Sequence, residues 1–311
     1  MSLHALYDLP APAKLNLFLH VIGRRADGYH LLQSIFTLIN WQDTLHLERR
    51  DDGRIQRHDL GPALPAEDLC LRAARALQQA SGCPLGVDIS IDKQVPWGAG
   101  LGGGSSDAAT VLLGLNRLWD LRWSRERLLS LGATLGADVP FFLGGHTAFV
   151  EGIGEILTPI DLPAGRWAVL KPAAALPTPK IFSSELLTRD TKPVKVAGLL
   201  AELQQQRETR LTTEKSEETF WGRNDLQAAA EALCPDVKQA ARLLAERFGN
   251  SRMTGSGSAV FADADAGGDD ASETDAGTSP VATLLEGSWP EGWVGRMCRG
   301  LANHPLEDWV N

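Results

Sequence analysis

Apolar and polar residues alternate along residues 13–21, whose sequence is AKLNLFLHV. Five apolar side chains share one face of an extended segment: Ala13, Leu15, Leu17, Leu19 and Val21. The opposite face carries four others: Lys14, Asn16, Phe18 and His20. A period of two is typical of a strand with one face on the core and the other towards solvent. We therefore predict a half-buried β-strand here.

The rest of the first half combines short alternating runs with helical spacing. The pattern predicts strands at 35–40, 44–48 and 87–92, and Asp27-Gly28 indicates a turn. Apolar residues recur with helical spacing in three further segments, at 68–80, 105–119 and 124–131.

A second set of elements begins near residue 164. A strand is predicted at 167–171, followed by helices at 194–206 and 226–248 and a strand–loop–strand unit at 251–262. We therefore predict two domains, 1–163 and 164–311. Because strands and helices do not alternate regularly, the pattern favours an α+β class over a doubly wound parallel sheet.

Composition excludes several classes of protein. The chain has 311 residues, of which 43% are hydrophobic and 22% charged, as in globular proteins. It contains no apolar run long enough for a membrane span, and its N-terminus lacks a basic start followed by an apolar segment. The four cysteines are scattered, and no HExxH pattern occurs. We expect a cytoplasmic protein with no membrane partner, no disulfides and no metal site of its own.

The net charge of −9 argues against nucleic acid as a partner, because phosphate backbones are bound through clustered lysine and arginine. Six of the acidic residues fall between Asp263 and Asp275, where no basic residue occurs. The stretch 263–280 lacks aromatic and large aliphatic side chains, so it offers little apolar surface to offset the entropy of ordering. We predict a disordered acidic insert, with an interaction tail as the alternative.

A glycine-rich segment, PWGAGLGGGSS, occupies residues 96–106 between a predicted strand and a predicted helix. Its five glycines allow close backbone approach to a ligand and positive φ angles: Gly98, Gly100, Gly102, Gly103 and Gly104. The helix, predicted to begin at Ser105, adds unpaired N–H groups and a positive dipole end. This combination predicts a phosphate site, against the alternative of a connection that binds nothing.

Three common phosphate motifs fit this segment poorly. Gly98, Gly100 and Gly103 match GxGxxG, but a helix rather than a second strand is predicted after residues 118–127. No Gly-Lys-Ser/Thr closes the loop, as a Walker A motif requires. Ser105 stands where the protein-kinase loop has valine.

The full string PWGAGLGGGSSDAA resembles the ATP-binding motif of the GHMP kinase superfamily. PAKLN at 12–16 and RMTGSG at 252–257 are similar to its first and third motifs. PAKLNLFLHVIGRRADGYHLLQSIF, LGADVPFFLGGHTAFVEGIGE and PTPKIF resemble the branch that acts on a cytidine-diphosphate-linked sugar alcohol in the non-mevalonate isoprenoid pathway. The resemblance covers most of residues 10–262. It departs from the family in the length of the acidic insert and in Trp97, where a smaller flexible residue is expected.

The resemblance implies a two-domain GHMP kinase architecture. The ATP domain at the N-terminus would resemble ribosomal protein S5, and a ferredoxin-like α/β sandwich would follow it. It also implies ATP and Mg²⁺ as cofactors. The phosphate loop would comprise these residues: Pro96, Trp97, Gly98, Ala99, Gly100, Leu101, Gly102, Gly103, Gly104, Ser105 and Ser106. For Ser105 and Ser106, helix capping is an equal alternative to contact with phosphate or metal.

By the same resemblance, Asp138 is the catalytic base that takes the proton of a substrate 2-hydroxyl, and Lys14 stabilises the developing charge. Taken alone, a strand lysine is usually a solvated surface group, and an aspartate before a turn is usually a cap.

For the substrate, the resemblance implies that Tyr29 and Phe182 sandwich the cytosine ring. His30 and Asn16 would offer hydrogen bonds, and Thr178 and Gly255 further contacts. Flat aromatic surfaces suit a base, and bonds to its edge give discrimination. The alternatives are a hairpin packing role for Tyr29 and a core role for Phe182.

Three functions compete. The first is a kinase for a cytidine-diphosphate-linked methylerythritol, expected as a monomer or weak homodimer. The second is another GHMP kinase, acting on mevalonate, homoserine or a sugar, which gives Tyr29, His30 and Phe182 no purpose. The third is a dinucleotide-binding oxidoreductase or a non-catalytic nucleotide binder.

Overall fold

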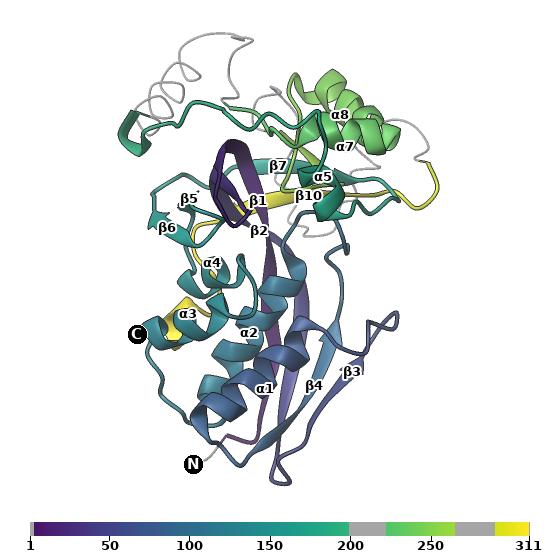
Figure 1. Ribbon diagram of the computed structural model, residues 1–311. Helices are drawn as coiled ribbons and strands as arrows, with labels where there is room; N and C mark the ends of the chain where they lie inside the picture. Colours follow the sequence, from purple (N-terminus) through teal and green to yellow (C-terminus); the bar gives the residue numbers. More distant parts are fainter. Residues whose placement is uncertain (1–2, 199–221, 265–289, 311) are drawn as a thin grey trace.

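Two long antiparallel strands, β1 (Ala5–Arg24) and β2 (His30–Arg50), run side by side through most of the molecule (Figure 1). The computed structural model describes residues 3–198, 222–264 and 290–310. The predicted turn joins the two strands: Gly28 has φ +92°, and its N–H donates to the carbonyl of Arg25 at 3.0 Å. The strands predicted at 35–40 and 44–48 are one strand, because the residues between them stay extended and pair with β1.

The remaining strands extend this pair on both sides. Neighbouring strands follow the order β3-β4-β2-β10-β7-β9-β8. These are β3 (Ile55–Asp59), β4 (Gly86–Asp92), β10 (Val294–Leu301), β7 (Arg166–Lys171), β9 (Val260–Asp263) and β8 (Arg252–Met253). β5 (Ala148–Glu151) pairs with β2, and β6 (Ile156–Pro159) pairs with β5. Only the β3–β4 pairing is parallel among these described strands.

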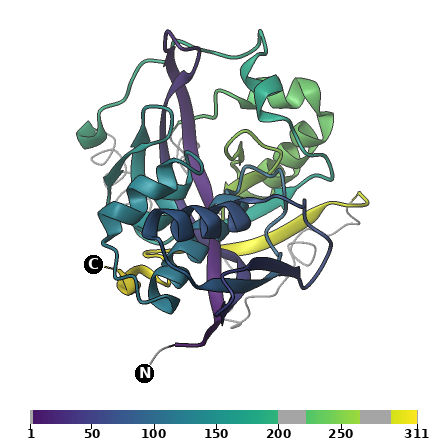
Figure 2. The same ribbon diagram turned by 60° about the horizontal axis from the view of Figure 1, so that its bottom comes forward.

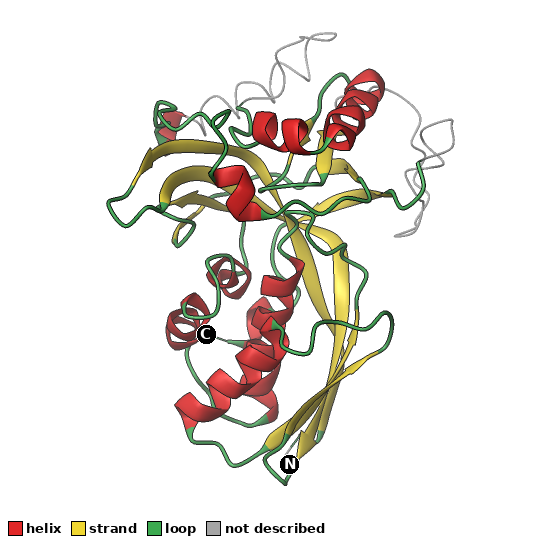
Figure 3. Ribbon diagram, turned by 45° about the vertical axis from the view of Figure 1, so that its right-hand side comes forward, coloured by secondary structure: helices red, strands yellow, loops and turns green. Residues whose placement is uncertain are grey.

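Four helices lie beside the strands in the lower part of the molecule (Figures 2 and 3); the first two contact the strands, and the last two pack against the second helix and against each other. They are α1 (Leu69–Ser81), α2 (Gly103–Leu118), α3 (Arg125–Ala133) and α4 (Val139–Gly144). Local signals set the limits of α1, because the Asp68 side chain accepts from the N–H of Leu71 at 3.0 Å and Gly82 ends the helix with φ +67°. The three helices predicted here are confirmed, but α2 begins at Gly103 rather than at Ser105.

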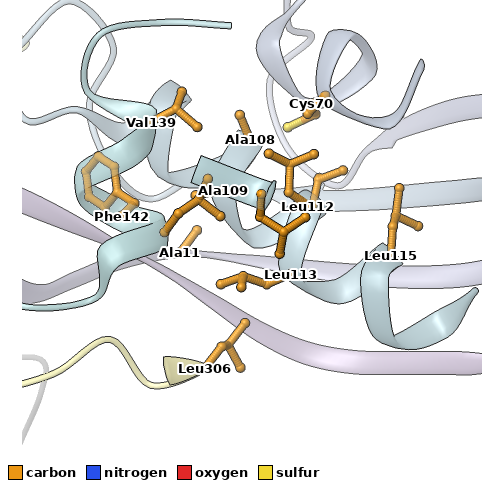
Figure 4. Packing of buried hydrophobic residues seen from close by; sticks show 14 of the residues in the cluster. Ala11, Cys70, Ala108, Ala109, Leu112, Leu113, Leu115, Val139, Phe142 and Leu306 are labelled. Atoms are coloured by element: carbon orange, nitrogen blue, oxygen red, sulfur yellow. The ribbon is translucent and has the colours of Figure 1, made fainter. Parts of the chain in front are cut away.

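The helix α2 is buried along most of its length. It forms the centre of the hydrophobic core in the lower part of the molecule, called the lower core below (Figure 4). Its side chains pack with residues from β1, α1, α4 and the chain's C-terminal segment: Ala11, Cys70, Val139, Phe142 and Leu306. A helix that is apolar on nearly all sides needs partners on all sides, and these elements supply them.

A second helical layer covers β7 and β9 in the upper part of the molecule (Figure 1). It consists of α5 (Thr178–Phe182), α7 (Gln227–Leu233) and α8 (Pro235–Phe248). The single helix predicted at 226–248 is wrong, because Cys234 is extended at φ −144°, as residues before proline tend to be. Of the helix predicted at 194–206, residues 196–198 are helical and residues 199–206 lie outside the described part.

The C-terminal segment returns to the lower part of the molecule. After β10, the short 3₁₀ helix η2 (Glu307–Trp309) lies near α3. Arg125 donates to the carbonyl oxygens of Glu307 and Val310 at 2.6 and 2.8 Å. Two-domain α+β architecture is confirmed, while the boundary at 163/164 stays a prediction.

The face of β1 predicted to meet solvent is instead buried. Lys14, Asn16 and His20 are 3%, 2% and 8% exposed, so the half-buried interpretation is wrong. Distant segments cover this strand: the N–H of Lys14 donates to the carbonyl of Leu101 at 3.0 Å, and the N–H of Asn16 donates to Thr254 Oγ1 at 2.8 Å. The second domain and the glycine loop therefore enclose a polar strand face.

Most of the predicted acidic insert cannot be compared with the structure. β9 ends at Asp263, and residues 265–280 lie outside the described part of the chain.

We expect Leu112→Ala to lower the free energy of unfolding by about 2–5 kcal/mol, because it removes a fully buried side chain from the lower core. Leu60→Ala, at a leucine that is 56% exposed, is the matched control and should change stability by less than about 0.5 kcal/mol. Urea denaturation of both variants measures the difference. Equal losses would contradict the packing of α2.

Candidate functional site

The glycine loop is anchored by apolar side chains within it and just before it. Val95, Ala99 and Leu101 are buried in a cluster that also contains residues of β1, β2, β7 and β9. Three backbone hydrogen bonds tie the loop down: the carbonyls of Gly98, Ala99 and Leu101 accept from Ser258, Ala259 and Lys14 at 3.2, 3.1 and 3.0 Å. These contacts therefore fix the loop in place between the two domains.

Glycine is required at the points where this loop crosses other backbone. Gly98, Gly100 and Gly102 all have positive φ, at +65°, +76° and +72°. A Cβ atom on Gly100 would lie 2.4 Å from the carbonyl oxygen of Thr254, which belongs to the RMTGSG segment. The predicted second and third motifs thus pack directly against each other.

The start of α2 presents unpaired backbone donors. Gly102 is the N-cap, and no side chain caps the helix, so the capping interpretation of Ser105 and Ser106 is wrong. The first N–H groups of a helix have no intrahelical partner and lie at its positive dipole end. Ser106 Oγ is buried without a hydrogen-bond partner among the described residues. This end of α2 can accept an anion, with Ser106 as a further polar group.

Lys14 and Asp138 meet beside this loop. Lys14 Nζ lies 3.7 Å from Asp138 Oδ2, with the lysine side chain 4% exposed and the aspartate 32% exposed. Asp138 is the N-cap residue of α4, yet its carboxylate makes no capping hydrogen bond. The structure therefore contradicts the usual roles of both residues: the lysine is not a solvated surface group, and the aspartate side chain does not cap the helix.

Several groups stabilise the buried ammonium of Lys14. Its Nζ donates to Asn16 Oδ1, and it lies 4.6 Å from the centre of the Phe36 ring. Asn16 is held by its own bond from Nδ2 to Ser34 Oγ at 3.0 Å. Desolvation lowers the pKa of Lys14 below its ordinary value, and the charge of Asp138 opposes that shift.

One cavity of about 780 Å³ connects these groups with the predicted substrate residues. It is lined by Lys14 and Asp138, by Gly100 and Gly102 of the loop, and by all six residues predicted to bind substrate: Asn16, Tyr29, His30, Thr178, Phe182 and Gly255. The other loop residues do not line it, and the Trp97 side chain is 80% exposed. The catalytic pair, part of the loop and the substrate residues therefore share one space.

An aromatic and polar group forms the far end of the cavity. The His30 and Phe182 rings stack with centres 5.0 Å apart and planes at 28°. Tyr29 is 61% exposed and lies in the same wall. Thr178 Oγ1 and Ser256 Oγ are 2.8 Å apart, which links α5 to the third motif. Phe182 thus faces His30 directly, and the sandwich of a base between Tyr29 and Phe182 stays a prediction.

Sequence reasoning missed several residues of the site. Ser34 and Phe36, which hold Asn16 and Lys14, lie on β2, where Phe36 pairs with Asn16 and Ser34 with Leu19. Both fall within the long string that resembles the family, but nothing in that string marked them individually. Arg24 and Ser256 also line the cavity; both lie within the motif strings recognised in the sequence, but neither was singled out as a site residue.

Among the described residues, no group of three or more histidine, cysteine, aspartate or glutamate side chains is placed to hold a metal ion. Mg²⁺ usually keeps waters and binds through one or two protein oxygens together with substrate phosphates. The buried Ser106 hydroxyl and the Asp138 carboxylate fit that kind of arrangement.

We expect Gly100→Ala to weaken binding of a non-hydrolysable ATP analogue by at least about tenfold, because the new Cβ both requires a strained φ and overlaps backbone. Gly61→Ala is the control, since Gly61 has open space around its Cβ position. Titration calorimetry gives the affinities, and thermal unfolding checks that each variant is folded. A folded Gly100→Ala protein with normal affinity would contradict a role of this loop in nucleotide binding.

Comparison with known proteins supports the same family as the motifs. The model of the GHMP kinases N terminal domain matches residues 68–146, and that of the GHMP kinases C terminal matches residues 202–271. The 4-diphosphocytidyl-2-C-methyl-D-erythritol kinase of Methylibium petroleiphilum is 61% identical over 311 residues, covering 100% of both chains. That of Albidiferax ferrireducens is 51% identical over 306 residues, covering 98% of this chain and 96% of the relative.

A solved structure agrees with these relatives. A crystal structure of 4-(cytidine 5'-diphospho)-2C-methyl-D-erythritol kinase superposes with a TM-score of 0.73 at 35% identity, covering 96% of this chain and 100% of the other. The resemblance read from the three glycine-rich and lysine-containing motifs is confirmed. The chain belongs to the 4-diphosphocytidyl-2-C-methyl-D-erythritol kinase family of the GHMP kinases.

Proposed function

We propose that this protein transfers the γ-phosphoryl group of ATP to the 2-hydroxyl of 4-diphosphocytidyl-2-C-methyl-D-erythritol. As a member of this family, the protein is a kinase of the non-mevalonate isoprenoid pathway and uses ATP. The observation that carries the residue-level proposal is the single cavity, which joins the Lys14–Asp138 pair and the glycine loop to an aromatic end suited to a base.

In this proposal Asp138 accepts the proton of the attacking hydroxyl. Its carboxylate lines the cavity and is not used by the helix that it precedes, so it is available to a ligand. Lys14 holds that carboxylate in place and offsets charge on the transferred group. Phosphoryl transfer asks a protein mainly for such positioning and charge stabilisation.

The loop and the start of α2 would hold the ATP phosphates. The free N–H groups of the first turn and the positive dipole end favour negative charge there. Backbone donors do not change charge with pH, and the anchored loop needs little reorganisation when ATP binds.

Mg²⁺ is part of the proposal as the partner of ATP. Ser106 Oγ, at the start of α2, would hold it together with the phosphates. When bound, the ion supplies neutralisation of phosphate charge, which no lysine in the loop provides.

The cytidine end is proposed to contain Tyr29 and Phe182 around the base, with His30 and Asn16 as hydrogen-bonding groups and Thr178 and Gly255 as further contacts. These residues share the cavity wall, and the His30 and Phe182 rings stack on each other with their planes at 28°. A nucleobase would stack on a ring face that this pair leaves open.

The competing functions do not gain support from the structure. In a dinucleotide-binding fold, a strand follows the helix that comes after the glycine-rich loop. Here that helix, α2, is followed by the helix α3. Kinases for mevalonate, homoserine or a sugar have no base to place against His30 and Phe182.

Several wider expectations stay predictions. They are a cytoplasmic location, a monomer or weak homodimer, and the absence of nucleic-acid and membrane partners. Within residues 3–198, 222–264 and 290–310, no helix has the length and apolar character needed to cross a bilayer.

We expect the cytidine-linked methylerythritol to be phosphorylated with a kcat/KM at least about a hundredfold above that of free methylerythritol, because contacts remote from the reacting hydroxyl help to orient it. A coupled ATP-consumption assay on both compounds, with mevalonate and homoserine alongside, measures this. Equal kcat/KM values for the free and the cytidine-linked alcohol would contradict the proposed substrate.

We expect Asp138→Asn to lower kcat by about 10²- to 10⁴-fold, the range typical of a lost general base. ATP affinity should change little, because the phosphates would be held by the loop. Lys14→Met should also lower kcat, and the double variant should lose less than the product of the two, since the pair acts together.

Asp161→Asn, at an exposed aspartate, is the matched control. Measuring kcat, ATP affinity and melting temperature on the same preparations separates catalysis from folding. A lower melting temperature with normal kcat per folded molecule would make Asp138 structural.

A further inference from the structure

Arg189 lies behind the aromatic end of the cavity and connects its two walls. It does not line the cavity itself. Its Nε donates to His30 Nε2 at 3.3 Å, and its Nη2 donates to the carbonyls of Phe182 and Ser184 at 3.1 and 2.9 Å. Its Nη1 donates to the carbonyl of Leu187 at 3.2 Å. One guanidinium thus links the start of β2 to the loop that follows α5.

The bond to His30 determines which ring nitrogen carries the proton. Arginine has only donors and keeps its charge in proteins. His30 Nε2 must therefore accept, which makes the ring neutral with its proton on Nδ1. Desolvation, followed by the charges of Arg189 and Arg24, lowers the pKa of His30 and so favours this neutral form. No described residue accepts a hydrogen bond from Nδ1, so that donor is free for a ligand.

The other bonds hold the Phe182 side of the site. The carbonyls of Phe182, Ser184 and Leu187 span the exit of α5, and all three converge on one side chain. The helix α5 has only five residues and no side-chain cap, and turn hydrogen bonds such as Leu187 N–H to the carbonyl of Ser184 at 3.4 Å continue the chain after it. Arg189 adds bonds from one side chain to three carbonyls of this turn. The ring of Phe182 is in turn stacked on His30.

We propose that Arg189 is a positioning residue for base recognition: it fixes His30 as an Nδ1–H donor and holds Phe182 in stacking position. This rests on the proposed function, because a base must enter this end of the cavity. A donor-only edge suits cytosine, whose N3 and O2 both accept. Uracil presents an N3–H donor at the same place and is disfavoured.

The first test is the tautomer of His30 in the wild-type protein. A long-range ¹H–¹⁵N spectrum of protein labelled on histidine distinguishes the two neutral tautomers and the charged form, and His30→Asn assigns the signal. We expect the Nδ1–H tautomer in the wild type and a mixture of both in Arg189→Met. An Nε2–H or fully charged His30 in the wild type would overturn the proposal, whether or not any variant folds.

The second test is kinetic. Because the lost bonds involve a charged donor, Arg189→Met should raise KM for the cytidine-linked substrate by about tenfold. KM for ATP and kcat should stay within about threefold, and the preference for the cytidine over the uridine compound should fall by about fivefold or more. Lys192→Met, at an exposed lysine three positions along the same segment, removes the same charge and should change none of these.

A conservative variant separates geometry from charge. Arg189→Lys keeps the charge but cannot reach His30 and three carbonyls at once, so it should behave like Arg189→Met. Full rescue by lysine, or an unchanged KM and base preference in folded Arg189→Met, would overturn the proposal. If the wild type phosphorylates neither nucleotide-linked compound, the proposed function fails, and the wild-type spectrum still decides whether Arg189 sets the His30 tautomer.

Discussion

The pairing of β1 with β2 is the constraint on which the site depends. The two strands extend from the lower into the upper part of the molecule, and their register shifts on either side of Lys14 and Asn16, between Pro12 and Ala13 and again between Asn16 and Leu19. Such bulges re-aim side chains near active sites. Because side chains alternate between faces, a slip of one residue would turn the lysine away from the cavity. The position of Lys14 in the site therefore depends on strand register.

Burial of the β1 face that carries Lys14 disfavours the charge of the lysine, and the surrounding residues offset this effect. An ammonium group loses hydration when it is buried, and the lowered pKa of Lys14 is the sign of that loss. Asp138, the carbonyl oxygen of the Asn16 side chain and the Phe36 ring all face the ammonium and favour its charged form. The same lysine anchors the glycine loop through its backbone N–H. The position of the catalytic pair and that of the loop are thus coupled through one residue.

Sequence patterns predicted what is encoded locally. The glycine loop, the PAKLN segment and RMTGSG could each be recognised, as could most of the long elements, and the structure brings the three motifs together. The burial of both faces of β1 was not predictable, because Leu101 and Thr254, which cover it, lie far away in sequence. The helix α5 is too short to show a helical period, and β10 (VGRMCRGL) has no regular alternation of apolar and polar residues. Arg189 has no local pattern at all, since its role depends on three carbonyls and a histidine that only the fold assembles.

The cavity lies between the two domains, and both of them contribute to its walls. Lys14, Asp138 and the glycine loop belong to the first part, whereas Thr178 and Phe182 come from α5 in the second. A substrate that reaches both ends contacts both parts at once. The buried cluster of Val95, Ala99 and Leu101 with β7 and β9 holds the two domains in a fixed relative position. The place where the base binds then determines where the other end of the substrate lies. Binding free energy gained at the base can then be used to align a hydroxyl against Asp138, which is how remote contacts raise a rate rather than only an affinity.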